Sequence, residues 1–363
     1  MQKDERTRVH SLLKRFGYHS QSYNVLGPNM RYFFSTKGTE GVIAYVTHAR
    51  VALGAGDPIC DVSDVRTLVG EFREFCKSKR WKCCFQSVTD RWRDVWEGLG
   101  FGMLKVGEEP IYDLGRLSWT GSDFRDLRRE VRRAEKHGMK VVEYQPIVTR
   151  SEDWELQMAE LSRRWREFKG SGELSFLIGT PSLEEPGDRK YFLALAGENV
   201  EAFVVCTPVY ARKGIYFDLM RRKEKTLSGT AQLLITKSLE LLKAQGYEMA
   251  TLGTVPLSNE AVEEPDKGSL IQLGIELAFD SIRYFYNIKP LYEFKDQFGP
   301  SSWEGRYLTF SPARFTPNIP YAVLKAYDPT GVTGQLKRQL GQVWKGLRWI
   351  RETPRDLVER LVR

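Results

Sequence analysis

The sequence predicts an α/β protein in which mixed sheets are flanked by helices. Two observations lead to this fold class. Short apolar runs of strand length alternate with segments whose apolar residues recur at helical spacing. The order hairpin, acidic residue, helix and strand also occurs twice along the chain, which indicates internal duplication of one α/β fold. Because 363 residues are many for a single core, we expect two domains.

The first copy begins with a basic helix that ends at Gly17. Three strand-like runs follow, and either Asp61 or Ser63 can cap the next helix. A strand and a short helix complete the unit. In order, these elements are expected at residues 5–17, 31–35, 41–46, 50–53, 64–79, 82–88 and 90–98.

The second copy has two strands, a helix and a final strand. Asp218 directly follows the second strand, and the leucines of the helix lie on one face. These elements are expected at residues 200–206, 215–217, 229–245 and 249–252. We therefore expect a first domain at residues 1–140 and a second domain, which carries the site, at residues 141–310. A C-terminal segment is expected at residues 311–363.

A basic helix at 122–138 is expected to connect the domains. Most of its cations recur at three- and four-residue steps and lie along one side: Arg125, Arg128, Arg129, Arg132, Arg133 and Lys136. One interpretation is a solvated face with local acidic partners. The other is a surface that contacts a phosphate backbone. The sequence leaves both interpretations open.

The C-terminal segment starts with a proline-bearing, linker-like stretch at 311–330. Residues 331–363 carry eight basic and three acidic side chains, and an apolar stripe runs along 331–352. This composition is typical of a helix that lies on an anionic lipid surface. A helix that docks on the protein's own core fits the same pattern.

The bulk composition narrows the function classes. A net charge of +8 favours a polyanionic partner, either nucleic acid or an anionic membrane. The five cysteines and four histidines are scattered without metal-ligand spacing, so we expect reduced thiols, no metal and a cytosolic setting. Neither a signal-peptide pattern nor an 18-residue apolar run is present.

Most catalytic signatures are absent, including phosphate-binding glycine loops and nucleophile elbows. The layout strand, Asp218, basic loop and helix resembles an acyltransferase of the GNAT type, in which a helix N-terminus receives a pyrophosphate. Residues 222–230 do not match the acyl-CoA loop of that fold. Coenzyme A is therefore not expected as the donor, and no cofactor is expected.

A more specific resemblance covers residues 16–310. The sequence resembles the cytosolic synthase domain of the phosphatidylglycerol lysyltransferase (multiple peptide resistance factor) family in eight stretches, which occur in family order: FGYHSQSYNVL (16–26), YFFS (32–35), GDPI (56–59), GEEPIYDL (107–114), FDLMR (217–221), SGT (228–230), GYEMATLGTVPLS (246–258) and FYNIKPLYEFKDQFGPSSWEGRYL (285–308). The last motif departs from the family pattern, because Gly305 stands where a proline is usual.

The resemblance implies tandem GNAT-like folds and transfer of an amino acid, Lys or Ala, from aminoacyl-tRNA to a lipid hydroxyl, with phosphatidylglycerol as the leading acceptor. It makes the basic helix a candidate tRNA-binding surface. The integral-membrane flippase region of the family is missing from this sequence, so we expect a free-standing cytoplasmic synthase that associates peripherally with the inner face of the membrane.

Under this resemblance, Asp218, Glu304 and Arg306 are the candidate catalytic residues. Asp218 could act as a base or position a hydroxyl or ammonium group, and Arg306 could hold a phosphate. The candidate substrate-binding residues are Arg221, Asp57, Glu108, Glu109, Gly253, Ser258 and Tyr307. Structural roles remain open for several, such as a turn for Asp57 and a core position for Tyr307.

Two other functions remain open. The acceptor could be a sterol, a diacylglycerol or a peptide, because peptidoglycan-bridge aminoacyltransferases share the tandem GNAT layout. Alternatively, the protein could be a non-catalytic binder of tRNA or anionic membranes. The sequence does not identify the transferred amino acid.

Overall fold

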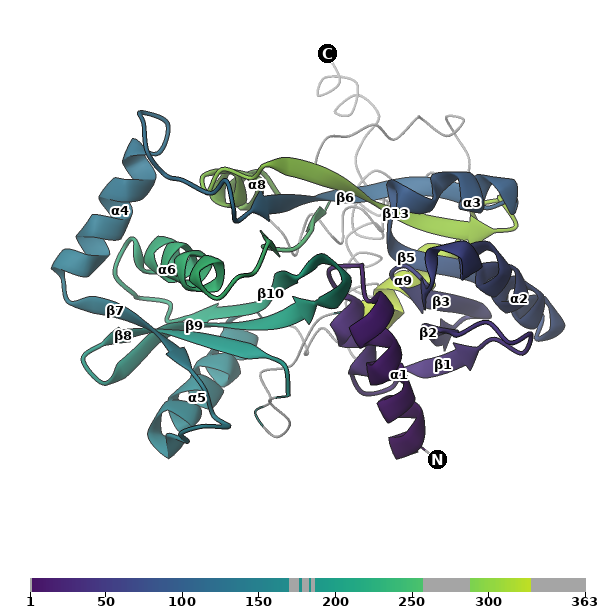
Figure 1. The fold of residues 1–363 in the computed structure, drawn as a ribbon, viewed down its shortest axis with the longest axis horizontal. Coiled ribbons are helices and arrows are strands. Elements are labelled where there is room, and N and C mark those ends of the chain that lie inside the picture. The colour runs from purple at the N-terminus through teal and green to yellow at the C-terminus, as the bar shows by residue number, and fades with distance from the viewer. Residues whose placement is uncertain (1, 170–175, 178–182, 184–186, 257–287, 328–363) are drawn as a thin grey trace, which may run out of the picture.

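The structure is a computed structural model that describes residues 2–169, 176–177, 183, 187–256 and 288–327. Within these residues the strands form one mixed sheet (Figure 1). Its order is β1 (Arg31–Phe34), β2 (Gly41–His48), β3 (Val51–Ala55), β5 (Lys82–Thr89), β13 (Ser302–Ser311), β6 (Gly102–Asp113), β11 (Met249–Thr251), β10 (Gly214–Arg222), β9 (Asn199–Val209), β8 (Lys190–Ala196) and β7 (Met139–Tyr144). The short strands β4 (Ile59–Cys60) and β12 (Val255–Pro256) pair with β2 and β6.

The same crossover occurs in both halves of the sheet. Strands β3 and β5 are parallel and are connected through α2, and strands β10 and β11 are parallel and are connected through α6. The described helices are α1 (Gln2–Phe16), η1 (Ser22–Leu26), η2 (Val62–Asp64), α2 (Val65–Ser78), η3 (Asp90–Trp92), α3 (Arg93–Gly98), α4 (Arg125–Lys136), α5 (Glu152–Lys169), η4 (Tyr210–Arg212), α6 (Thr230–Ala244), α8 (Ile288–Asp296) and α9 (Asn318–Tyr327).

The expected strands and helices of both copies are present, with ends shifted by a few residues. Several further elements were not anticipated. Strand β6 contains Gly107, Pro110 and two adjacent glutamates, a composition that argues against a strand when read locally. Its neighbours in the sheet supply the hydrogen bonds and packing that override this local preference.

Part of the stretch expected to be a linker is instead the helix α9. Its residues Ile319, Ala322 and Ala326 are buried in the core that also contains Leu308 and Phe310. This burial explains why a proline-bearing segment is helical, since prolines are tolerated in the first turn. The helix expected at 331–352 lies outside the described residues.

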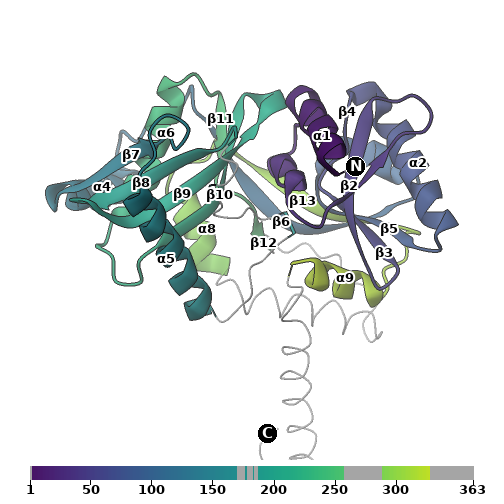
Figure 2. The same ribbon diagram turned by 90° about the horizontal axis from the view of Figure 1, so that it is seen from below.

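The long strands β6 and β13 run side by side across the middle of the molecule and join its two lobes (Figures 1 and 2). β13 is the last of the described strands in the sequence, yet it lies between β5 and β6. β6 pairs on its other edge with β11 of the second lobe. The division into domains at 1–140 and 141–310 stays a prediction, and residues 302–311 return to strands of the first stretch.

The N-terminus of α6 is covered by α4. Gly229 has φ +90°, and a Cβ added there would lie 2.2 Å from the carbonyl oxygen of Glu130. The Ser228 hydroxyl also donates to the Glu130 carboxylate at 2.6 Å. The start of α6 at Gly229-Thr230 therefore packs against α4.

We expect Gly229→Ala to destabilise the protein more than Gly246→Ala. Both glycines have left-handed φ angles, +90° and +84°, so each alanine carries a similar backbone strain of about 1–2 kcal/mol. Only Gly229 faces another backbone, because no atom lies within 4 Å of an added Cβ at Gly246. Overpacking should add roughly 1–3 kcal/mol at Gly229. Urea unfolding measures both costs, and equal losses would contradict the close approach of α4.

Candidate functional site

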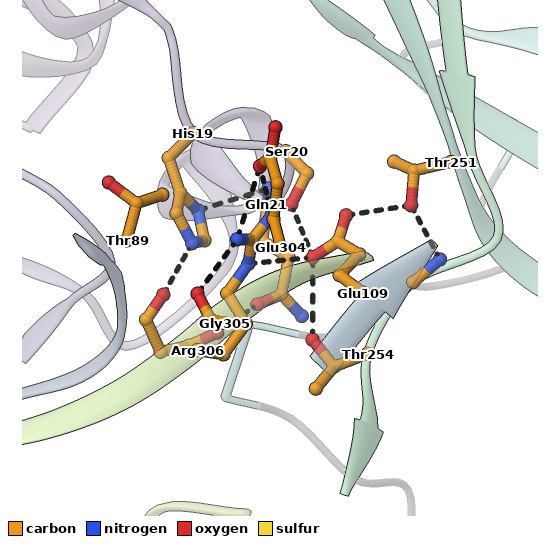
Figure 3. A network of polar contacts seen from close by, with 12 residues as sticks. His19, Ser20, Gln21, Thr89, Glu109, Thr251, Thr254, Glu304, Gly305 and Arg306 are labelled. Atoms are coloured by element: carbon orange, nitrogen blue, oxygen red, sulfur yellow. Dashed lines mark hydrogen bonds and ion pairs between the residues drawn. The ribbon is translucent and has the colours of Figure 1, made fainter. Parts of the chain in front are cut away.

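A fully buried ion pair between Arg306 and Glu109 lies at the centre of the candidate site (Figure 3). Arg306 on β13 donates from Nε to Glu109 on β6 at 2.8 Å, and both side chains are 0% exposed. Burial raises the pKa of Glu109, but the charge of Arg306 and hydrogen bonds from Thr251 and Ser20 bring it below its usual value. Glu109 is therefore ionised.

The Glu109 carboxylate accepts hydrogen bonds from hydroxyl groups of both lobes. Ser20 precedes η1 and donates at 3.0 Å, while Thr251 on β11 and Thr254 after it donate at 2.8 and 3.4 Å. With Arg306, these groups satisfy the buried charge, as burial requires. The pair thus connects the segment before η1 to β6, β13 and the loop after β11.

Glu304 extends the network toward solvent. Its carboxylate accepts from both terminal nitrogens of Arg306, at 3.2 and 3.3 Å, and from Arg212 at 2.8 and 3.2 Å. Glu304 lies opposite Glu109 in the β13–β6 register, so both carboxylates lie on the same face of the sheet. Burial lowers the pKa of Arg306, but Glu109 and Glu304 raise it above its ordinary value.

The segment that follows α1 is an organising element of the site. His19 Nε2 lies 2.6 Å from the carbonyl of Ser87, and its Nδ1 accepts from the backbone N–H of Gln21 at 3.1 Å. These contacts suit a neutral ring protonated on Nε2, and burial lowers the pKa of His19. Gln21 in turn accepts from the Ser87 hydroxyl at 3.0 Å. The segment is therefore fastened to β5.

Asp218 lies at an irregularity of β10. The pairing with β9 shifts between Phe217 and Leu219, so Asp218 is the extra residue of a bulge. A bulge redirects a side chain and is common beside active sites. The Asp218 carboxylate accepts from Asn24 Nδ2 at 2.9 Å, which connects it to the same segment that carries Ser20. Asp218 is half-buried rather than enclosed.

Lys295 on α8 is buried beside the network. Its Nζ donates to the carbonyls of Gly253 and Thr254 at 2.7 and 3.2 Å. Burial lowers its pKa to about 7, although Glu109 acts in the opposite direction. Because Thr254 also donates to Glu109, Lys295 helps to hold the loop that reaches the central ion pair.

The structure brings together only some of the residues expected to bind substrate. Glu109 and Gly253 belong to the network around Arg306. Arg221 is mostly buried, with its guanidinium 3.6 Å from the centre of the Trp165 ring. Ser258 lies outside the described residues.

Three expected residues have structural contacts with other parts of the chain or of their own strand. Asp57 is buried and accepts from the backbone N–H and hydroxyl of Thr89 at 2.9 and 2.7 Å, which fastens its loop to the end of β5. Glu108 pairs with Lys105 on the sheet face opposite Glu109, because neighbouring strand residues alternate. The two adjacent glutamates therefore lie on opposite faces of the sheet. Tyr307 packs beneath Arg93.

The basic helix expected at 122–138 is α4, at the far end of the second lobe (Figure 1). Arg129 pairs with Asp126 at 2.9 Å, and Arg128 donates to the Trp119 carbonyl at 2.6 Å. Within the described part of the chain, its other cations form no ion pair: Arg125, Arg132, Arg133 and Lys136. This face is exposed and positive.

Several residues of the network were missed from sequence. His19, Ser20, Gln21 and Asn24 lie within a conspicuous polar run after a glycine-terminated helix, and that run was a usable signal. Lys295 gave none, because a lysine on an amphipathic helix is ordinarily exposed.

The described residues contain one hollow of note but no metal-binding cluster and no membrane-spanning helix. No group of three or more His, Cys, Asp or Glu side chains is arranged there to hold a metal ion. A hollow of 410 Å³ lies beside Asp188, Tyr210 and Tyr247, and its lining includes none of the expected site residues. In the same part of the chain, no helix combines the length and apolar composition needed to cross a bilayer.

Solved structures share this fold. A putative lysylphosphatidylglycerol synthetase C-terminal domain from Agrobacterium fabrum superimposes with a TM-score of 0.75 at 21% identity, over 92% of this chain and 98% of that one. L-PGS from Bacillus licheniformis gives 0.74 at 22% identity, over 89% and 96%. The predicted fold class, α/β with a mixed sheet flanked by helices, is confirmed.

The sequence identifies the family. The model of the family described as "Phosphatidylglycerol lysyltransferase, C-terminal" matches residues 10–310, so the chain belongs to that family. A phosphatidylglycerol lysyltransferase of Bacillus subtilis is 24% identical over 314 residues, 86% of this chain. An uncharacterised Corynebacterium glutamicum protein is 26% identical over 297 residues, 79% of this chain. The matches span 36% of the length of each of these relatives.

We expect Arg306→Met to lower the free energy of unfolding by about 3–5 kcal/mol, because Glu109 is left charged and buried. The double variant Arg306→Met/Glu109→Gln removes that charge and should recover part of the loss. Chemical denaturation of the two variants and the wild type measures the effect. A double variant no more stable than the single one would contradict the assignment of a buried ion pair.

We also expect Lys295 to make stability rise with pH. The pKa of Lys295 is about 7 in the folded state, whereas the pKa of an unfolded lysine is about 10.4. Between these pH values the unfolded state therefore binds one more proton than the folded state. The stability of the wild type relative to Lys295→Met should therefore increase between about pH 7.5 and 9.5, by at most ~1.4 kcal/mol per pH unit. Urea titrations across this range test it, and a constant difference would contradict the lowered pKa.

Proposed function

We propose that the chain transfers an aminoacyl group, Lys or Ala, from aminoacyl-tRNA to a hydroxyl of a membrane lipid, with phosphatidylglycerol as the leading acceptor. The observation that carries the proposal is the family match over residues 10–310, because it includes every residue of the buried network and Asp218. The names of the relatives supply the lipid and the lysyl group, and tRNA as donor is our inference.

The main task of the protein in this reaction is to position the two substrates. The ester bond of an aminoacyl-tRNA is already activated, so bringing it close to the lipid hydroxyl supplies much of the rate enhancement. The hydroxyl oxygen forms a bond to the ester carbonyl carbon, and the ester bond to the terminal ribose then breaks. The proton leaves the lipid hydroxyl and reaches the departing ribose oxygen.

In this proposal Asp218 receives that proton and returns it to the ribose oxygen. Its carboxylate is half-buried, and Asn24 orients it through one oxygen. Such a position suits a general base that must meet two substrates. Glu304 lies at the solvent end of the network, and we propose that its carboxylate faces the ammonium group of the amino acid. Arg306 then keeps Glu304 in place.

The exposed cations of α4 are proposed to contact the tRNA backbone. Four of them form no ion pair among the described residues and are therefore available for phosphates: Arg125, Arg132, Arg133 and Lys136. The lipid acceptor requires the protein to act at an anionic membrane surface, and we propose peripheral association from the cytoplasmic side.

The direct test incubates purified protein with radiolabelled charged tRNAs and liposomes of defined composition. We expect label from lysyl- or alanyl-tRNA to appear in the lipid phase when phosphatidylglycerol is present. Transfer from no charged tRNA to any lipid would overturn the proposal.

In the same assay, Asp218→Asn should reduce transfer by about 10²–10⁴-fold, because it removes the base while keeping the shape. The control is Asp94→Asn, which makes the same change at an exposed position on α3. Equal activity of the two variants would exclude Asp218 as the base.

A further inference from the structure

Arginines and aromatic rings gather beside the solvent end of the network. The guanidinium of Arg91 lies 4.0 Å from the centre of the Tyr18 ring and 4.7 Å from that of Trp92. Tyr18 and Trp92 are half-buried, while Arg91 is exposed. Arg91 forms no ion pair within the described residues. None of the expected site residues belongs to this group.

This group is physically connected to the candidate site. The guanidinium of Arg212 lies 5.0 Å from the centre of the Tyr18 ring and also bonds Glu304 at 2.8 Å. Glu304 in turn bonds Arg306. A continuous row of side chains therefore leads from the exposed Arg91, past Tyr18, to the buried ion pair. His19, the residue after Tyr18, is fixed to β5 through Ser87, so the ring of Tyr18 starts from an anchored backbone.

The chemistry of the group suits unpaired nucleotides. Single-stranded RNA is bound by stacking of its bases on aromatic rings and on arginine planes, together with cations that pair with its phosphates. A guanidinium that stacks through its face still has N–H groups at its edge for phosphate oxygens. A lipid phosphate would use the cation but would gain nothing from rings stacked with it.

We propose that Tyr18, Arg91 and Trp92 bind the unpaired 3′ end of a tRNA and direct it toward Glu304. This inference rests on the proposed function and deepens it, because it names the part of the donor that meets the site. It also separates two contacts: α4 meets the phosphate backbone at the far end of the second lobe, and the Tyr18–Arg91–Trp92 group meets the terminal nucleotides.

The test compares the binding of two labelled, uncharged tRNAs by fluorescence anisotropy. One is intact, and the other lacks its last three nucleotides. The wild type should bind the intact tRNA more tightly, on the order of tenfold, the effect of one stacked base. Arg91→Ala and Tyr18→Leu should each remove most of this preference.

Two controls show that the effect is specific. Tyr18→Phe keeps the ring and should keep the preference. Arg66→Ala removes one exposed arginine from α2 and should also keep it. Because Arg91 is exposed, its alanine variant is expected to fold, and an unchanged thermal midpoint checks this.

The inference fails if the wild type binds both tRNAs equally, or if Arg91→Ala and Tyr18→Leu keep the full preference. It also fails if these variants lose only liposome binding, which would assign the group to lipid. A wild type that transfers label but shows no 3′-end preference refutes the inference alone. A 3′-end preference lost in the variants supports it even where no lipid accepts the label.

Discussion

The buried pair of Arg306 and Glu109 is the interaction on which the rest of the site depends. Two opposite charges with no solvent exposure are tolerated only when each is paired and hydrogen-bonded. Glu109 meets this requirement by accepting from Ser20 and Thr251, which come from parts of the chain far apart in sequence. The need to satisfy one carboxylate thus fixes where the segment after α1, the two central strands and the loop after β11 meet.

The buried ion pair also positions the residues at the exposed end of the network. The buried Arg306 donates to Glu304, and Glu304 also accepts from Arg212. The partly exposed carboxylate of Glu304 is therefore positioned by the buried guanidinium of Arg306. Asp218 is positioned separately, by a bulge in β10 and by Asn24. Ser20 and Asn24 belong to one short segment, which therefore couples the acid on β10 to the ion pair between β6 and β13.

The sequence predicts the elements of this fold better than their assembly. Local pattern is enough to place Asp218 after an apolar strand. It also places Glu304 and Arg306, which are two residues apart on one strand, on the same face of the sheet. Local pattern has no information about contacts across nearly two hundred residues, such as Asn24 with Asp218. It also made no prediction at β6, a central strand that contains Gly107 and Pro110. It predicted a linker at α9, which is a buried helix despite its prolines.

We propose that the aminoacyl group enters between Asp218 and the Glu304–Arg306 end of the network. A crystal structure with a stable amide analogue of lysyl-adenosine tests it most directly. We expect density for the amino acid in contact with Glu304, and density for the amide beside Asp218. Density in the 410 Å³ hollow beside Asp188 and Tyr210, with none at Asp218, would contradict it.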